Sequence, residues 1–204
     1  MKNPMNRVAR MLVLPVSMLA AALLLPNLGC DKDDKPATPN AAVSPAAKMA
    51  VAVIKPAGSA ATQPTNKEVT GTVTFTPEKD GVKAVADLTG LTPGKHGIHI
   101  HENADMSDPG LKSAGGHWDP DGHKQHGGPM ADGDKRHAGD LGNLEADANG
   151  KAHYEVMVSG VSIGGKNDIV GHSVVIHAGE DDLKSNPAGN SGGRVAGGAI
   201  EARK

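Results

Sequence analysis

The feature that most constrains the fold of this chain is an apolar–polar alternation of period two, which recurs in eight short segments rich in Val, Ile and Thr. Segments of this kind, bounded by Gly, Pro, Asp and Asn, are typical of β-strands with one buried face. No sustained apolar stripe of helical period follows residue 30, so the pattern predicts an all-β, eight-stranded sandwich or barrel. The eight segments are residues 49–55, 68–76, 82–88, 95–101, 139–147, 151–159, 171–178 and 194–202.

Aromatic residues and loop lengths refine this expectation. Aromatic side chains make up only 1% of the chain, so the core must consist of Val, Ile, Leu and Ala. Two connections, residues 102–138 and 179–193, contain no strand pattern. Loops of this length inside a compact domain are uncommon and usually functional. We therefore expect the functional residues to lie in or beside these two loops.

The first thirty residues have the pattern of an export signal rather than of a folded element. Basic residues precede the apolar run 11–25, which is too short and too interrupted by proline to favour a membrane span. The run ends in Leu-Gly-Cys at Cys30, the only cysteine, and this ending resembles the lipobox of bacterial lipoproteins. The resemblance implies lipidation of Cys30 and a membrane-anchored protein of the cell envelope, periplasmic or otherwise extracytoplasmic. A plain secretory signal, cleaved elsewhere, is the alternative.

The composition after the signal separates a tether from a domain. Residues 31–48 are charged, rich in Pro and Ala and aperiodic, as expected of a flexible tether, and segment 59–66 has the polar character of a loop. The domain then spans residues 49–204. Of the chain's 21 basic and 23 acidic residues, 6 and 3 lie in residues 1–48, which leaves 15 and 20 and a net charge of −5 for the domain. This charge argues against a nucleic-acid partner.

Histidines gather beside the first long loop: seven of the ten lie between residues 96 and 137. His99 and His101 alternate along one predicted strand, so their side chains share a face and lie about 7 Å apart. This spacing suits two ligands of one metal ion. An exposed, alternating strand also produces this spacing by chance, so the pair alone is weak evidence and leaves both interpretations open.

Four motifs carry more information in combination. The stretches GKHGIHIHE, HGGP, RHAGDLGN and GNSGGR occur in the order, and nearly in the spacing, of the copper/zinc superoxide dismutases, and the chain resembles that family from about residue 49 to 202. The resemblance implies an immunoglobulin-like Greek-key β-sandwich with two long functional loops. It also implies an antioxidant oxidoreductase that converts superoxide anion to oxygen and hydrogen peroxide by a copper redox cycle, with one structural zinc and one copper per chain.

Residue by residue, the resemblance implies two metal sites that share one ligand. Copper would be bound by His99, His101, His117 and His177, and zinc by His117, His126, His137 and Asp140. Imidazole suits both metals, and three histidines with one carboxylate make a closed tetrahedral zinc site. Asp181 matches an aspartate that accepts hydrogen bonds from His99 and His126. Two residues would take part in the reaction: His117 by taking a proton as it releases copper, and Arg194 by attracting superoxide.

The chain also departs from the family pattern. Leu111 and Gly197 stand where the family has a disulfide between the zinc-side loop and the last strand, and such a bridge typically contributes roughly 2–4 kcal/mol. This loop must therefore rely on zinc and on packing, including packing by Leu111. Ala188 replaces a threonine that lines the substrate channel in the family, and the segment before Arg194 is shorter.

Several alternatives stay open at this point. His123 competes with His126 for zinc, with the HGGP context favouring His126. His96 is expected to be structural, and His153 and His172 to be solvated. The competing functional class is a non-catalytic protein that buffers or delivers copper in the cell envelope, and a third is a zinc-only structural relative. The retained Arg194 favours the enzyme, because a copper carrier needs no substrate-binding arginine. The oligomeric state is undetermined, with a homodimer as one alternative.

Overall fold

The computed structural model describes residues 49–58 and 68–204 of the chain. The expected export signal at residues 1–30, the lipidation of Cys30, the tether at 31–48 and the loop at 59–66 lie outside the described residues, so these remain predictions.

Eight strands form the described structure, and all eight predicted segments are confirmed with ends that agree within two residues. The described part contains two short 3-10 turns and no α-helix, and therefore no helix long and apolar enough to cross a membrane. The elements are β1 (Met49–Pro56), β2 (Thr70–Glu78), β3 (Gly81–Thr89), β4 (Gly94–His101), η1 (Lys112–Ala114), η2 (Gly133–Lys135), β5 (Asp140–Ala146), β6 (Ala152–Ser159), β7 (Ser173–His177) and β8 (Arg194–Arg203).

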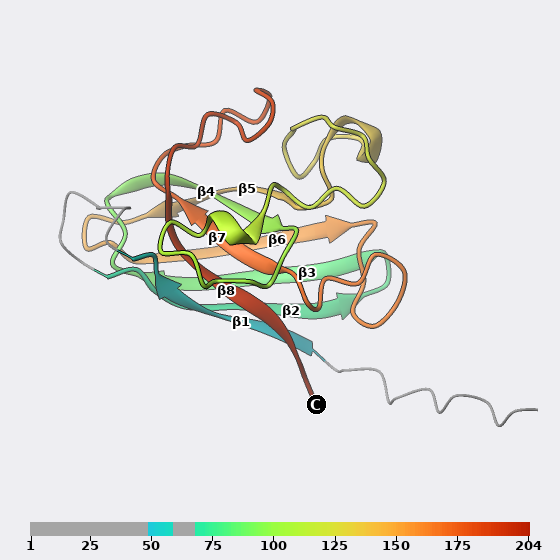
Figure 1. Cartoon of the computed structure of the whole chain (residues 1–204), viewed down its shortest axis with the longest axis horizontal. Helices are drawn as coiled ribbons and strands as arrows, with labels where there is room; N and C mark the ends of the chain where they lie inside the picture. The colour runs from blue at the N-terminus through green and yellow to red at the C-terminus, as the bar shows by residue number, and fades with distance from the viewer. Residues whose placement is uncertain (1–48, 59–67) are drawn as a thin grey trace, which may run out of the picture. The chain divides into compact units, whose positions relative to one another are not determined.

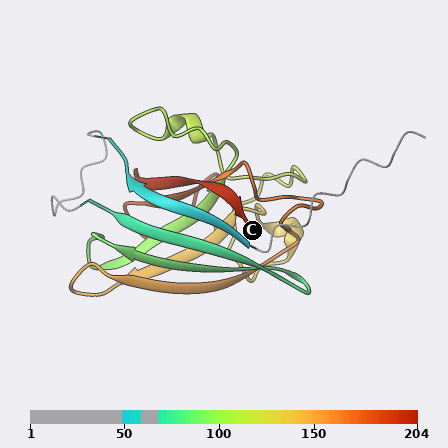
Figure 2. The same ribbon diagram turned by 90° about the horizontal axis from the view of Figure 1, so that it is seen from below.

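The strands make one antiparallel sheet in the order β5-β4-β7-β8-β1-β2-β3-β6. The sheet curves until β5 and β6 come into contact, which gives a nearly closed sandwich. Neighbours such as β4 with β7 and β8 with β1 are far apart in sequence, as Greek-key connections require. Figure 1 shows the strands crossing in two layers, and Figure 2 shows the same curvature from below. The predicted all-β sandwich is confirmed.

The core between the two layers is aliphatic, as the composition predicts. Alternate residues of the strands point inward, for example Ala50, Ala52 and Ile54 of β1, which are at most 1% exposed. Fully burying one such Val, Leu or Ile side chain contributes roughly 1.5–3 kcal/mol. Phe75 is the fully buried aromatic exception, and Trp118 packs against the core beneath the first long loop.

Strand β4 is buried on both faces, and this positions the site. Ile98 and Ile100 face the core, whereas His99 and His101 face the opposite side and are nevertheless at most 1% exposed. The two long loops between β4 and β5 and between β7 and β8 cover that second face (Figure 1). The histidine pair is therefore not on a solvated strand, which settles the alternative left open by the spacing.

Candidate metal centre

Four imidazoles converge on the loop-covered face of β4. His99 and His101 come from β4 and His177 from the end of β7, which pairs with β4 in antiparallel register. His117 arrives from the long loop, where its backbone bridges that of His101. One ligand nitrogen from each of the four rings lies within 4.8 Å of the others. Residues from three separate parts of the sequence thus meet at one point.

The hydrogen bonds of these four rings leave one nitrogen of each ring free. The far nitrogens are engaged: His99 Nε2 with Asp181 at 2.8 Å, His101 Nδ1 with the Gly115 carbonyl at 3.0 Å, and His177 Nδ1 with the Gly192 carbonyl at 3.2 Å. Within the described part of the chain, no hydrogen-bond partner reaches the remaining buried nitrogens, which are His99 Nδ1, His101 Nε2, His117 Nε2 and His177 Nε2. Buried polar atoms are rarely left without a partner, so four together fit a metal ion such as copper.

Burial keeps these rings in the form that binds metal. Desolvation lowers the pKa of His99 to about 3, even though its hydrogen bond to Asp181 opposes the shift. Burial likewise lowers the pKa of His177 to about 4 and that of His101 well below its ordinary value. The rings are therefore neutral at neutral pH, and a neutral imidazole offers its lone pair to a metal ion.

A second cluster surrounds the carboxylate of Asp140, the first residue of β5. The Nδ1 atoms of His117, His126 and His137 lie 2.8, 3.0 and 3.2 Å from Asp140 Oδ1. Ligands at about 2.0 Å from a tetrahedral zinc are about 3.3 Å apart, so these spacings fit a closed zinc site. The other oxygen, Asp140 Oδ2, accepts from the backbone N–H of Gly127 and of His137.

The charge of the second cluster also suits a cation. Burial raises the pKa of Asp140, but the three histidines outweigh that effect and hold the pKa far below its ordinary value. Burial lowers the pKa of His126, but Asp140 and Asp181 outweigh it and raise the pKa to about 9. In the absence of metal, the raised pKa favours a protonated His126, whose single positive charge offsets one of the two negative charges of Asp140 and Asp181. A zinc ion would take the place of that proton.

His117 belongs to both clusters. Its Nδ1 faces Asp140 at 2.8 Å, whereas its Nε2 is one of the four partnerless nitrogens of the first cluster. The side chain is 3% exposed, so neither nitrogen can turn to bulk water. Once the proton on Nδ1 is lost, the ring offers a lone pair at each end and is suited to bridge two metal ions.

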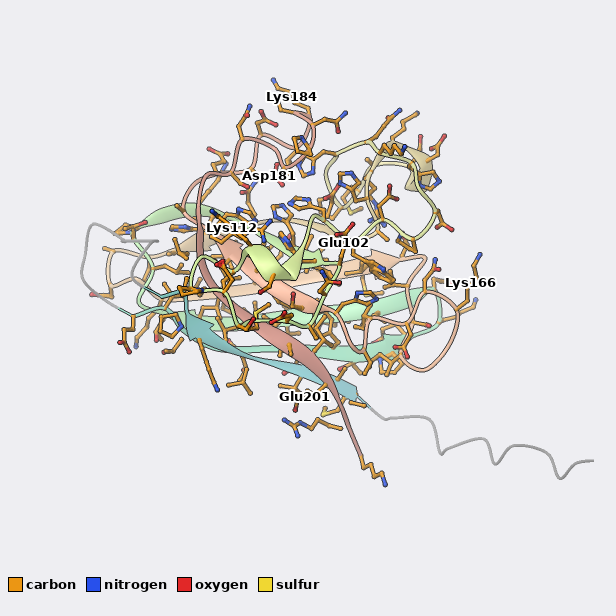
Figure 3. The ribbon with its side chains drawn as sticks, viewed as in Figure 1. Glu102, Lys112, Lys166, Asp181, Lys184 and Glu201 are labelled. Carbon is orange, nitrogen blue, oxygen red and sulfur yellow. The ribbon has the colours of Figure 1, made fainter. Side chains whose placement is uncertain are left out.

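Asp181, on the loop between β7 and β8, ties the two clusters together. Its Oδ2 accepts from His99 Nε2 at 2.8 Å and its Oδ1 from His126 Nε2 at 2.7 Å. These contacts fix the tautomer and orientation of one ring in each cluster. Both ring nitrogens already bind the carboxylate, so His99, His126 and Asp181 form a hydrogen-bonded bridge rather than a third metal site. Figure 3 places Asp181 between the strands and the loop tip at Lys184.

Arg194, the first residue of β8, approaches the first cluster from the side of the long loop. Its guanidinium donates from Nη1 to the Leu111 carbonyl and from Nη2 to the Gly115 carbonyl. The Gly115 carbonyl also accepts from His101 Nδ1, so the arginine and a ring of the first cluster share one acceptor. A partly buried cation is thereby held next to the four imidazoles.

Comparison with known proteins agrees with this geometry. The family model described as copper/zinc superoxide dismutase matches residues 69–200. The chain belongs to the copper/zinc superoxide dismutase family. Membership supports a superoxide dismutase-like function with copper and zinc as the metals, and it confirms the family that the sequence motifs indicate.

Similar proteins come from distant sources. The "Superoxide dismutase [Cu-Zn]" of Deinococcus radiodurans is 40% identical over 66% of this chain and 79% of its own length. The "Extracellular superoxide dismutase [Cu-Zn]" of Brugia pahangi is also 40% identical, over 66% of this chain and 70% of its own. The "Superoxide dismutase [Cu-Zn]" of Paramecium bursaria Chlorella virus 1 is 46% identical over 62% of this chain and 70% of its own length. The crystal structure of the clock protein EA4 covers 78% of this chain and 97% of its own, with 36% identity and a TM-score of 0.65.

Leu111 of the first long loop lies beside Gly197 of β8. Leu111 is 5% exposed, and a Cβ built on Gly197 would lie 3.1 Å from Leu111 Cδ1. Leu111 thus packs against the last strand, as expected, although it also lines an open groove beside that strand. Arg194 and β8 thus hold the loop by hydrogen bonds and apolar packing.

The remaining histidines lie outside both clusters. His96 is 1% exposed and bonds to the carbonyls of His177 and Thr92, so its structural role is confirmed. The side chain of His153 is 61% exposed, as expected for a solvated residue. His172 is only partly solvated, because its ring packs against that of Trp118 in a tilted arrangement, with ring centroids 4.4 Å apart. His123 Nδ1 lies 4.0 Å from Asp119 Oδ1, and His123 belongs to neither cluster. Of the two candidates, His126 is the histidine that lies beside Asp140.

Three further residues hold the site, and the sequence analysis did not identify them. Asn143 binds both backbone groups of Asp181, donating to its carbonyl and accepting from its N–H at 2.8 Å each. Asn186 accepts from the N–H of His126 at 2.6 Å. Gly189 lies so close that a Cβ would be 1.7 Å from Asp181 Oδ1. Asn143 and Gly189 stand in or beside motifs that were recognised, which is the signal that could have drawn attention to them.

Proposed function

We propose that this chain is a copper/zinc superoxide dismutase that holds one copper and one zinc. The observation that carries the proposal is the set of four buried, partnerless imidazole nitrogens next to a guanidinium, with His117 shared by a second cluster. His99, His101, His117 and His177 would hold the copper. His117, His126, His137 and Asp140 would hold the zinc. Bound copper supplies the one-electron redox chemistry that turns superoxide into oxygen and hydrogen peroxide.

The protein's own residues bind the anion and handle the proton. Arg194 attracts and orients superoxide, because its guanidinium is fixed by two loop carbonyls and keeps its charge at any physiological pH. His117 takes up a proton at Nε2 in one half of the cycle and gives it up in the other. Asp181 keeps the rings of His99 and His126 in fixed tautomers throughout the cycle.

Metal analysis together with an activity assay tests this proposal. The full chain is purified, copper and zinc per chain are measured, and superoxide decay is followed by pulse radiolysis. The expected result is one equivalent of each metal and rapid, catalytic decay. Stoichiometric copper without dismutation would overturn the enzyme in favour of a copper buffer or carrier. Zinc without copper would favour a structural relative.

We further propose that the protein is exported and anchored to a membrane through a lipid on Cys30, with residues 31–48 as a tether to the domain at 49–204. The lipobox-like ending at Cys30 supports this proposal, and an extracellular relative agrees with a location outside the cytoplasm. Labelling of cells with an alkyne fatty acid tests it. The full chain should incorporate label and Cys30→Ser should not, whereas an unlabelled, freely released protein would indicate a plain secretory signal.

A further inference from the structure

Arg136 is the largest fully buried side chain that the function above does not use. It is 2% exposed and directly precedes His137. Within the described residues, no carboxylate lies within ion-pair distance of its guanidinium. Arginine is almost never fully buried without a paired charge, because removing the guanidinium from water is costly. Its presence here therefore requires a compensating role.

The guanidinium makes two sets of hydrogen bonds in two different places. Nη1 donates to the carbonyls of His137 and Ala138 at 2.9 and 3.4 Å. Nη2 donates to the carbonyl and to the hydroxyl of Ser159, both at 3.1 Å. Ser159 is the last residue of β6, so the rigid guanidinium joins the segment after Arg136 to the end of a core strand. The planar fork of arginine suits such a two-ended contact, which one ammonium group cannot reproduce.

The carbonyls to which Arg136 Nη1 donates belong to the turn at residues 137–140, which contains two residues of the second cluster. His137 and Asp140 lie three residues apart, and the N–H of Asp140 donates to the same His137 carbonyl at 3.2 Å. The N–H of His137 in turn donates to Asp140 Oδ2 at 2.9 Å. Movement of the His137 carbonyl would therefore shift both ligand atoms. Asp140 is also the acidic group whose charge favours the buried guanidinium.

We propose that Arg136 is a positioning residue for zinc: it fastens the 137–140 turn to the end of β6 and so sets the spacing of His137 Nδ1 and Asp140 Oδ1. The inference rests on the zinc site proposed above. It adds a residue that touches neither metal nor substrate, and it predicts that the zinc site depends on a hydrogen-bonded fork rather than on a charge.

Cobalt(II) and zinc(II) binding to the metal-free full chain tests the proposal. Cobalt(II) reports the geometry of the zinc site through its visible absorption, and competition with a chelator gives the affinity. Three variants are compared with the unaltered chain: Arg136→Lys keeps the charge, Arg136→Met keeps the bulk, and Ser159→Ala removes only the hydroxyl acceptor. Arg203→Met is the matched control, because Arg203 lies exposed at the end of β8, 3.1 Å from Glu201.

Loss of a group that orients a metal ligand typically weakens metal binding roughly 10–100-fold. We expect a loss of this size and an altered cobalt spectrum in Arg136→Lys and Arg136→Met, a smaller loss in Ser159→Ala, and no change in Arg203→Met. Thermal unfolding of the metal-free proteins separates positioning from folding. If Arg136→Met does not fold, Arg136→Lys and Ser159→Ala carry the comparison.

Two results would overturn the positioning role. One is unchanged affinity and spectrum in Arg136→Lys, since charge alone would then suffice. The other is weakened binding that merely follows an equal fall in the stability of the metal-free protein. Failure of the unaltered chain to bind cobalt(II) or zinc(II) would instead remove the proposed zinc site itself, and the inference with it, so the two failures are distinguishable.

Discussion

At the scale of single residues, the site depends most on His117, whose two nitrogens face different clusters. We predict that His117→Ala lowers the content of both copper and zinc, because each site loses one of four ligands. His137→Ala should lower zinc alone, since its ring reaches only the second cluster. Elemental analysis of purified variants measures both metals, with His153→Ala as an exposed control. Unchanged zinc in His117→Ala would contradict a shared ligand.

Arg194 is expected to act on the rate and not on the metals. Arg194→Ala removes the cation beside the four imidazoles, and electrostatic attraction of a charged substrate is typically worth a factor of about 10 to 1,000 in rate. We predict a fall of at least about tenfold in the superoxide decay rate, a weaker dependence on ionic strength, and intact copper and zinc. Arg203→Ala, at the exposed end of β8, serves as control. Copper loss in Arg194→Ala would show that the arginine holds the loop rather than the substrate.

His153 offers a pH-dependent contact away from the metals. A hydrogen bond to Asp87 at 2.7 Å raises its pKa above the ordinary value, with the negative charge of Asp87 as the second cause. Because the folded-state pKa is the higher one, the stabilising contribution is fully present below a pH of about 6.5 and is lost as the pH rises through the folded pKa. Proton NMR titration should show the pKa of His153 falling toward its ordinary value in Asp87→Asn. An unchanged pKa would contradict the pairing.

At the scale of elements, sequence reasoning succeeded where a regular pattern meets one buried face. The strands follow period-two alternation, so their bounds could be predicted closely. The burial of the β4 face that carries His99 and His101 could not be predicted in this way. The loops that cover this face are aperiodic and have no sequence pattern of their own. The resemblance to a family supplied Asp181 and Arg194 instead. The role of Asn143 was not predicted, because its hydrogen bonds to the backbone of Asp181 join positions 38 residues apart. No local sequence pattern encodes such a contact.

In the first half of the loop between β4 and β5, the side chain of Leu111 packs against β8. This side chain is buried against β8, but it also lines an open groove of about 390 Å³, so its surroundings can relax on truncation. We predict that Leu111→Ala lowers the free energy of unfolding by roughly 2 kcal/mol, the lower end for truncating a buried leucine. Urea unfolding of the metal-free protein measures it, and Lys112→Ala, the exposed neighbour, is the control. A change no larger than that of the control would show that packing does not replace the disulfide.

At the scale of the whole molecule, a rigid sandwich carries two loops that contain almost no regular structure. The sandwich is held by a continuous aliphatic core, whereas the first loop contributes three of the seven predicted ligands, His117, His126 and His137, and the two loops are joined to each other through Asp181 and Asn186. A ligand that binds only the native state stabilises it by mass action, by about 4 kcal/mol at a concentration 1,000 times its Kd. Order in the loops is therefore expected to depend on metal far more than order in the strands.

Metal removal tests this division of the molecule. We predict that chelation lowers the melting temperature and speeds amide hydrogen exchange mainly in residues 102–139 and 178–193, while the central strands β1 and β8 stay protected. No cysteine stands among the described residues to hold the first loop in the absence of metal, so its amides should be the first to exchange. Mass spectrometry of exchanged peptides resolves the two regions, and re-addition of zinc alone should restore protection to the first loop. Equal acceleration in strands and loops would mean that the metals stabilise the fold as one unit.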